Sequence, residues 1–153
     1  MPAPVPWSSR PERGCVRWRL HLVSPPEIVY RFLSTDAGRE SFWAEVSTET
    51  DGEIAWVFPS GRSGVARRLE SEEPRRFCCE YLDGSLAEFE LEPDGHGGTD
   101  LTLTNRDLPP EAVDEASGHW IARLLNLKAV ADQGIDLRNH DPDRTSERGF
   151  VED

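Results

Sequence analysis

Histidines and one turn serine are the first residues to weigh for chemistry. The four histidines are His21, His96, His119 and His140. None of their spacings matches a metal-binding motif, and no Cys-x-x-Cys pair accompanies them. Ser63 follows Gly61-Arg62, but Val65 stands where a nucleophile elbow needs its second glycine. We therefore expect no metal site, no cofactor and no serine nucleophile.

Aromatic side chains, in contrast, allow two interpretations: they fill the core, or they line a binding cavity, which is the functional hypothesis. Tryptophan is costly to bury unless its indole N–H finds a partner, yet several tryptophans fall on the inward sides of predicted elements. Flat aromatic walls with a few polar groups are typical of a site for a small hydrophobic or aromatic molecule. The predicted ligand-binding residues are Trp18, Trp43, Trp56, Phe58, Arg67, Tyr81, Phe89, His119, Trp120 and Leu124.

Three residues of this set are its predicted polar groups. Arg67 and Tyr81 lie on strand faces that the alternation assigns to the interior. An inward arginine is costly unless a carboxylate or an anionic ligand pairs with it. His119 precedes Trp120 on a predicted helix and can face either the cavity or solvent. If the chain were an enzyme, Arg67, Tyr81 or His119 would have to supply the acid or base; we expect a binding protein instead.

Hydrophobic periodicity places these residues on an antiparallel sheet and a long helix. The predicted strands cover residues 15–23, 46–50, 54–58, 65–69, 77–81, 87–91 and 99–104. Two short helices follow the first strand, the second over 35–42, and a long amphipathic helix runs over 112–133 to Gly134. The fold class is α+β, with a single curved sheet of about six or seven strands whose apolar face the long helix covers.

Composition limits the partners and the compartment. The 153 residues carry a formal charge of −12, so the overall field repels nucleic acid and anionic lipid headgroups. No stretch approaches the ~20 apolar residues of a membrane span. Three cysteines, an odd number, favour free thiols in a reducing compartment, and we expect a cytoplasmic protein, either a monomer or a homodimer. The expected organisation is a disordered arm over 1–13, one domain over 14–137 and a C-terminal tail over 138–153.

Several segments carry a likeness to a known family. They are Val23–Tyr30, Thr35–Trp43, Asp51–Trp56, Glu73–Phe77, Gly97–Thr104, Gly118–Trp120 and Leu124–Lys128. In this combination the chain resembles the START-like (SRPBCC) superfamily, which has the helix-grip fold. Within it, the chain is similar to the family of the activator of heat-shock protein 90 ATPase homologue, C-terminal domain. The resemblance covers residues 15–137.

The resemblance implies a fold and a hydrophobic cavity beneath the long helix. It implies no reaction, because relatives include lipid carriers, hormone receptors, polyketide cyclases, chaperone cofactors and antibiotic-resistance proteins. Binding of a small hydrophobic or aromatic molecule between sheet and helix is therefore the first expectation. Two alternatives stay open: a polyketide cyclase- or aromatase-like enzyme or antibiotic-sequestering protein, and a chaperone-cofactor-like interaction module that uses the outer sheet face.

Overall fold

The structure is a computed structural model that describes residues 7–8 and 13–153. Most of the arm predicted over 1–13 therefore lies outside the described residues. Trp7 is described, and its ring lies against the guanidinium of Arg17, 4.5 Å from ring centroid to Cζ.

The order of the elements confirms the prediction: one strand, two short helices, six strands and a long helix. The strands are β1 (Val16–Leu22), β2 (Val46–Thr50), β3 (Glu53–Val57), β4 (Ser63–Arg67), β5 (Arg76–Glu80), β6 (Leu86–Pro93) and β7 (Thr99–Arg106). The α-helices are α1 (Pro26–Ser34), α2 (Asp36–Phe42) and α3 (Val113–Gln133). Short 3-10 turns are η1 (Leu82–Gly84), η2 (Pro110–Ala112) and η3 (Ser146–Arg148).

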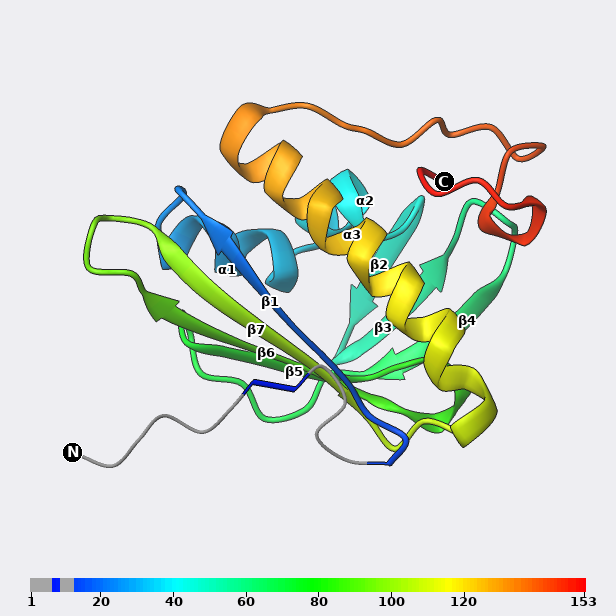
Figure 1. Ribbon diagram of the computed structural model, residues 1–153, viewed down its shortest axis with the longest axis horizontal. Helices are drawn as coiled ribbons and strands as arrows, with labels where there is room; N and C mark the ends of the chain where they lie inside the picture. The colour runs from blue at the N-terminus through cyan, green and yellow to red at the C-terminus, as the bar shows by residue number, and fades with distance from the viewer. Residues whose placement is uncertain (1–6, 9–12) are drawn as a thin grey trace.

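Within the described residues, the strands form two antiparallel ladders. One ladder has the order β1-β7-β6-β5, and the other has the order β2-β3-β4. A single bridge between Arg68 and Cys79 links them, so the hydrogen-bonded ladder is interrupted between β4 and β5. Together the two ladders curve around α3, as the sequence predicts (Figure 1).

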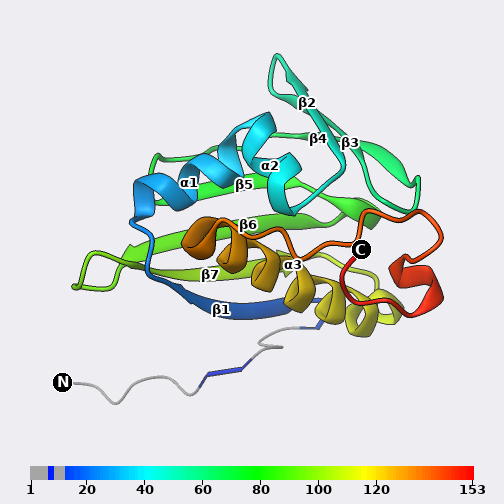
Figure 2. The ribbon, with the colours of Figure 1, turned by 90° about the horizontal axis from the view of Figure 1, so that it is seen from above.

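The three α-helices cover the same side of the strands (Figure 2). α3 presents the buried Trp120, Leu124 and Leu127 to the core and ends at Gly134, whose φ of +66° is the left-handed conformation that glycine adopts readily. From there the C-terminal tail, residues 138–153, returns across the molecule toward β3 and β4 (Figures 1 and 2). Among the described helices, none is long and apolar enough to span a membrane.

One strand is out of phase with the prediction. Ala66 pairs with Ile54 of β3, and both side chains are buried. Val65 and Arg67 therefore point outward, and the Arg67 side chain is 66% exposed. The prediction that Arg67 faces the interior is wrong because the large Val65 dominates the apolar pattern, whereas the small Ala66 is the residue that packs. The inward arginine is the next residue, Arg68.

Candidate functional site

The predicted aromatic cavity is filled by its own rings. Trp43 lies at the centre, with its ring centroid 4.7 Å from that of Trp56, 5.4 Å from Phe89 and 5.6 Å from Trp120. All four side chains are at most 2% exposed. Because interiors pack at the density of organic crystals, these contacts leave no space for a ligand between the rings. The expectation of a hollow walled by these tryptophans is corrected here: the rings form the core.

The remaining apolar residues of the predicted set also belong to this core or its edge. Phe58 stacks on Trp56, and Leu124 is 3% exposed. Trp18 is half-buried on β1, the strand that contacts α3, and its Nε1 is a buried donor without a partner among the described residues. None of these three side chains lines a cavity described below, so they support the fold.

A small cavity lies at the edge of the ring cluster, near the start of α3. It has a volume of about 50 Å³, and its walls include Tyr81, Asn105, His119, Trp120 and Arg123. This volume holds a few water molecules and excludes an aromatic ring. The structure thus brings two predicted polar residues, Tyr81 and His119, to one cavity and leaves Arg67 outside it.

The two predicted acid–base groups have shifted pKa values. Burial raises the pKa of Tyr81, and the charge of Arg123 opposes this shift. The Tyr81 hydroxyl accepts a hydrogen bond from Trp43 Nε1 at 3.1 Å. Burial, and then the charge of Arg123, lower the pKa of His119 below its usual value. At neutral pH both groups are therefore uncharged, and Arg123, in the same cavity wall, carries a positive charge.

A larger cavity, of about 290 Å³, lies between α3 and the C-terminal tail. One wall is a face of α3 that includes Gly118, His119, Ala122, Arg123 and Asn126. The end of α2 contributes Phe42 and Trp43, the tail contributes residues including Gly149, Phe150 and Val151, and Asp114, Glu115 and Asp153 add carboxylates. We call this space the α3–tail cavity. His119 and Arg123 line both cavities, so the two are neighbours.

Two polar side chains in the wall of the α3–tail cavity have no hydrogen-bond or ion-pair partner among the described residues. Asn126 is only 6% exposed, yet its side-chain amide makes no hydrogen bond to any described residue. Arg123 lies over the Phe58 ring, with Cζ 5.4 Å from the centroid, and forms no ion pair with a described carboxylate. The amide atoms of Asn126 are not among the solvent-inaccessible atoms without a partner, so they open into the cavity, where water or a ligand can bond them.

The tail that closes this cavity is held in place by its first residues. Arg138, which is 7% exposed, donates to the carbonyl oxygens of Glu40 and Ala44 at the end of α2, at 2.6 and 3.0 Å. His140 bridges two carboxylates, with Nδ1 2.6 Å from Glu45 and Nε2 2.7 Å from Asp136. We call these contacts the tail latch. Further along, Asn139 N–H donates to Glu152 O, which folds the tail back on itself.

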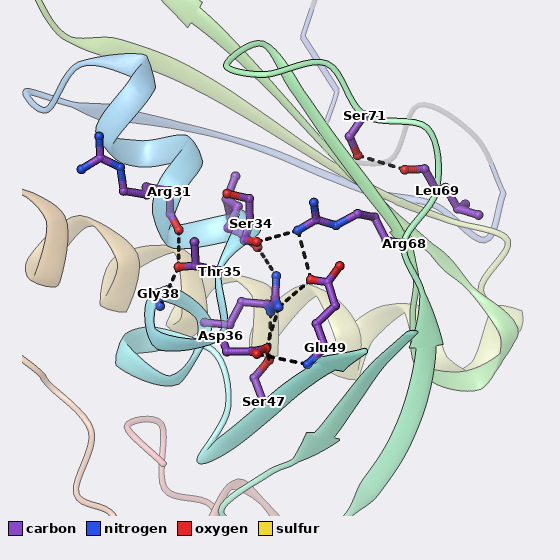
Figure 3. A network of polar contacts seen from close by, with 12 residues as sticks. Arg31, Ser34, Thr35, Asp36, Gly38, Ser47, Glu49, Arg68, Leu69 and Ser71 are labelled. Atoms are coloured by element: carbon purple, nitrogen blue, oxygen red, sulfur yellow. Dashed lines mark hydrogen bonds and ion pairs between the residues drawn. The ribbon is translucent and has the colours of Figure 1, made fainter. Parts of the chain in front are cut away.

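A second polar region connects α1 and α2 to the strands, and here the charges are paired (Figure 3). Arg39 is fully buried and donates to Asp36, Glu49, Ser47 Oγ and the Leu33 carbonyl, each at 2.9 Å. We call this region the Arg39 network. Neither Arg39 nor these four partners line the small cavity or the α3–tail cavity, and their contacts are with one another, so we assign them a structural role.

The inward arginine of β4 completes the Arg39 network. Arg68 Nη2 donates to Glu49 at 3.1 Å and to the Ser34 carbonyl, and the buried Nε has no partner among the described residues (Figure 3). Glu49 is thus the carboxylate partner that an inward arginine requires, but the inward arginine is Arg68 and not the predicted Arg67. Separately, among the described residues, no three His, Cys, Asp or Glu side chains gather where they could hold a metal ion.

Comparison with known proteins establishes the fold. No protein-family model matches the chain, and no curated protein matches its sequence. Solved structures do match, among them the Aha1 dimer from Colwellia psychrerythraea, with a TM-score of 0.70 and 19% identity over 78% of this chain and 97% of that one. CalU16 from Micromonospora echinospora matches with a TM-score of 0.63 and 20% identity over 76% of this chain and 74% of that one. The chain therefore has the helix-grip fold, in agreement with the START-like, Aha1-like resemblance of its sequence.

Sequence reasoning missed Arg123, Asn126 and the tail as parts of a site. Asn126 interrupts the apolar run Leu124-Leu125-Asn126-Leu127, and it lies on the same helix face as Ala122 and His119, four and seven residues earlier. This break in the apolar run was the available signal. No pattern indicated that the tail would fold back over that face, because the contacts that hold it are long-range.

Proposed function

We propose that the chain binds a small hydrophobic or aromatic molecule, and that this molecule occupies the α3–tail cavity. The observation that carries the proposal is a cavity of about 290 Å³ with aromatic walls, into which the amide of Asn126 opens without a hydrogen-bond partner among the described residues. This volume is close to the lower end of ordinary ligand cavities and suits a molecule with one or two rings. Burial of its apolar surface would drive binding, at ~25 cal/mol per Å².

The other functions expected from the resemblance find less support. The small cavity beside Tyr81 and His119 is too small for the folded chain that a cyclase- or aromatase-like enzyme must shape. For an interaction module, the outer face of β2–β4 exposes Val46, Val57 and Val65, but these valines do not identify a partner. The Aha1 neighbour is described as a dimer, which is compatible with the homodimer option for this chain.

Thermal denaturation with a library of small aromatic and aliphatic compounds tests the proposal. A ligand that binds only the folded state stabilises it, by ~2.7 kcal/mol at a hundredfold excess over Kd, and so raises Tm. Ala122→Trp places a ring inside the cavity and should abolish the stabilisation. Leu125→Trp is the matched control, because Leu125 is half-exposed on α3 outside the cavity wall. The proposal fails if no compound raises Tm, or if Ala122→Trp responds like Leu125→Trp.

A further inference from the structure

We propose that the ligand is a small organic anion with an apolar ring, and that Arg123 and Asn126 bind its anionic group. This inference rests on the proposed function and narrows its ligand class. It starts from the walls of the α3–tail cavity, which combine rings from α2 and the tail with one guanidinium and one amide from α3.

The guanidinium of Arg123 is available to a ligand. Its contact with Phe58 engages the face of the aromatic ring and leaves the N–H donors without a described carboxylate acceptor. The buried arginines elsewhere, Arg39 and Arg138, instead use several donors within the protein. Planar guanidinium donors match the geometry of a carboxylate, which is why arginine recognises such groups.

Asn126 lies three residues after Arg123 on α3, and positions three apart are neighbours on a helix surface. Both residues line the cavity. An amide N–H₂ beside a guanidinium offers additional donors to the oxygens of one carboxylate. A carboxylate bound there would satisfy the Asn126 amide, whereas an apolar ligand alone would leave it unpaired at a cost.

Acidic residues also line this cavity, and their positions limit their effect. Asp114 and Glu115 lie in the exposed first turn of α3, and the Glu115 side chain is 76% exposed. The carboxylate of Asp153 accepts the Ser146 backbone N–H at 2.8 Å. Water and salt screen exposed charges, so the direct contact with Arg123 should outweigh their repulsion of an anion.

Calorimetric titration of the full chain with three indoles tests the inference. Indole is neutral, indole-3-acetate is its anionic derivative and tryptamine its cationic one, so ring size is matched while charge varies. We expect indole-3-acetate to bind about tenfold more tightly than indole or tryptamine, the scale of one charge-assisted hydrogen bond. Arg123→Gln should abolish this preference while indole binding persists. Asn126→Leu should weaken indole-3-acetate more than indole.

Arg67→Gln is the matched control, because it makes the same change at an exposed arginine outside both cavities. It should retain the preference for the anion. If indole binds but the anion is not preferred, or if the preference survives in Arg123→Gln, the inference is overturned and the binding function stands. If none of the three indoles binds the unmodified chain and no library compound raises its Tm, the binding function itself fails.

Discussion

The Arg39 network and the wall of the α3–tail cavity are two buried polar regions with opposite chemistry. In the network, Arg39 is fully buried and each of its nitrogens donates to an acceptor of the protein. In the cavity wall, Asn126 is 6% exposed, and its amide opens into the cavity with no acceptor or donor among the described residues. Arg39 is thus fully paired within the protein, whereas the Asn126 amide is left to bond with whatever occupies the cavity.

This difference separates groups that stabilise the fold from groups available to a ligand. Removing one partner of a satisfied buried pair leaves an uncompensated charge and is strongly destabilising. Removing a polar group that has no protein partner destabilises little, because no interaction within the protein is lost. Matched substitutions in the two regions should therefore affect stability and binding in opposite ways.

The largest effect is expected at the centre of the Arg39 network. Arg39→Leu leaves Asp36 and Glu49 without their buried cation and should lower the free energy of unfolding by about 3–5 kcal/mol. Urea denaturation measures this loss. Arg39→Lys, which keeps the charge but not the forked geometry, should lose less. A loss below about 1 kcal/mol for Arg39→Leu would show that the network is not what stabilises this junction.

The substitution of asparagine by leucine can be compared at two buried positions, one with hydrogen-bond partners in the protein and one without. Asn105 is 1% exposed, donates to Leu86 O and accepts from Trp120 Nε1, both at 2.9 Å. Asn105→Leu should therefore lower the free energy of unfolding by about 2–3 kcal/mol, since it leaves both partners unpaired. Asn126→Leu should change it by less than about 1 kcal/mol, in either direction. Equal losses at the two positions in urea denaturation would contradict the assignment of Asn126 to a ligand.

The tail latch should weaken as the pH rises. Asp136, and then Glu45, raise the pKa of His140, while burial and the neighbouring Arg138 oppose the shift. Protonated His140 therefore stabilises the folded state. This stabilisation is fully present below the pKa of histidine in the unfolded chain, about 6.5, and is lost as the pH rises through the higher pKa of His140 in the folded chain. Asp136 has a pKa lowered to about 2, chiefly by its bonds to Arg138 and His140 against the effect of burial, so it stays ionised throughout this range.

Hydrogen exchange at the Asn139 N–H, which donates to Glu152 O, reports on the latch. After correction for intrinsic exchange, it should exchange faster at pH 8 than at pH 6. In His140→Gln this pH dependence should disappear. Slower exchange at pH 8, or the same pH dependence in the variant, would show that His140 does not hold the tail.

The smallest effect is expected at Arg67. Its ion pairs with Glu53 and Glu80 are both 3.8 Å long, and its side chain is 66% exposed. Arg67→Ala should change the free energy of unfolding by no more than about 0.5 kcal/mol. A larger loss in the same urea assay would indicate a role for the outer face of β4 that its exposed contacts do not explain.

Local patterns predicted the elements well, because alternation, helical spacing and turn residues act over a few neighbours. Thr35, for example, accepts from Gly38 N–H at the start of α2, which begins within one residue of the predicted start. The phase of β4 was lost because Ala66 is a weak apolar signal, and pairing with Ile54 decides which face it takes. Of the predicted site residues, Trp43 and His119 line the α3–tail cavity.

By itself, the sequence determined the helix-grip order of elements and the concentration of aromatic residues inside it. Only the tertiary structure decided that Trp56 and Trp120 pack on Trp43 with no space between the rings, and that Arg123 and Asn126 lie beside a cavity closed by the tail. The physical reason is that periodicity assigns a residue to a face. Whether that face meets another side chain or open space depends on ångström-scale separations between elements far apart in the chain.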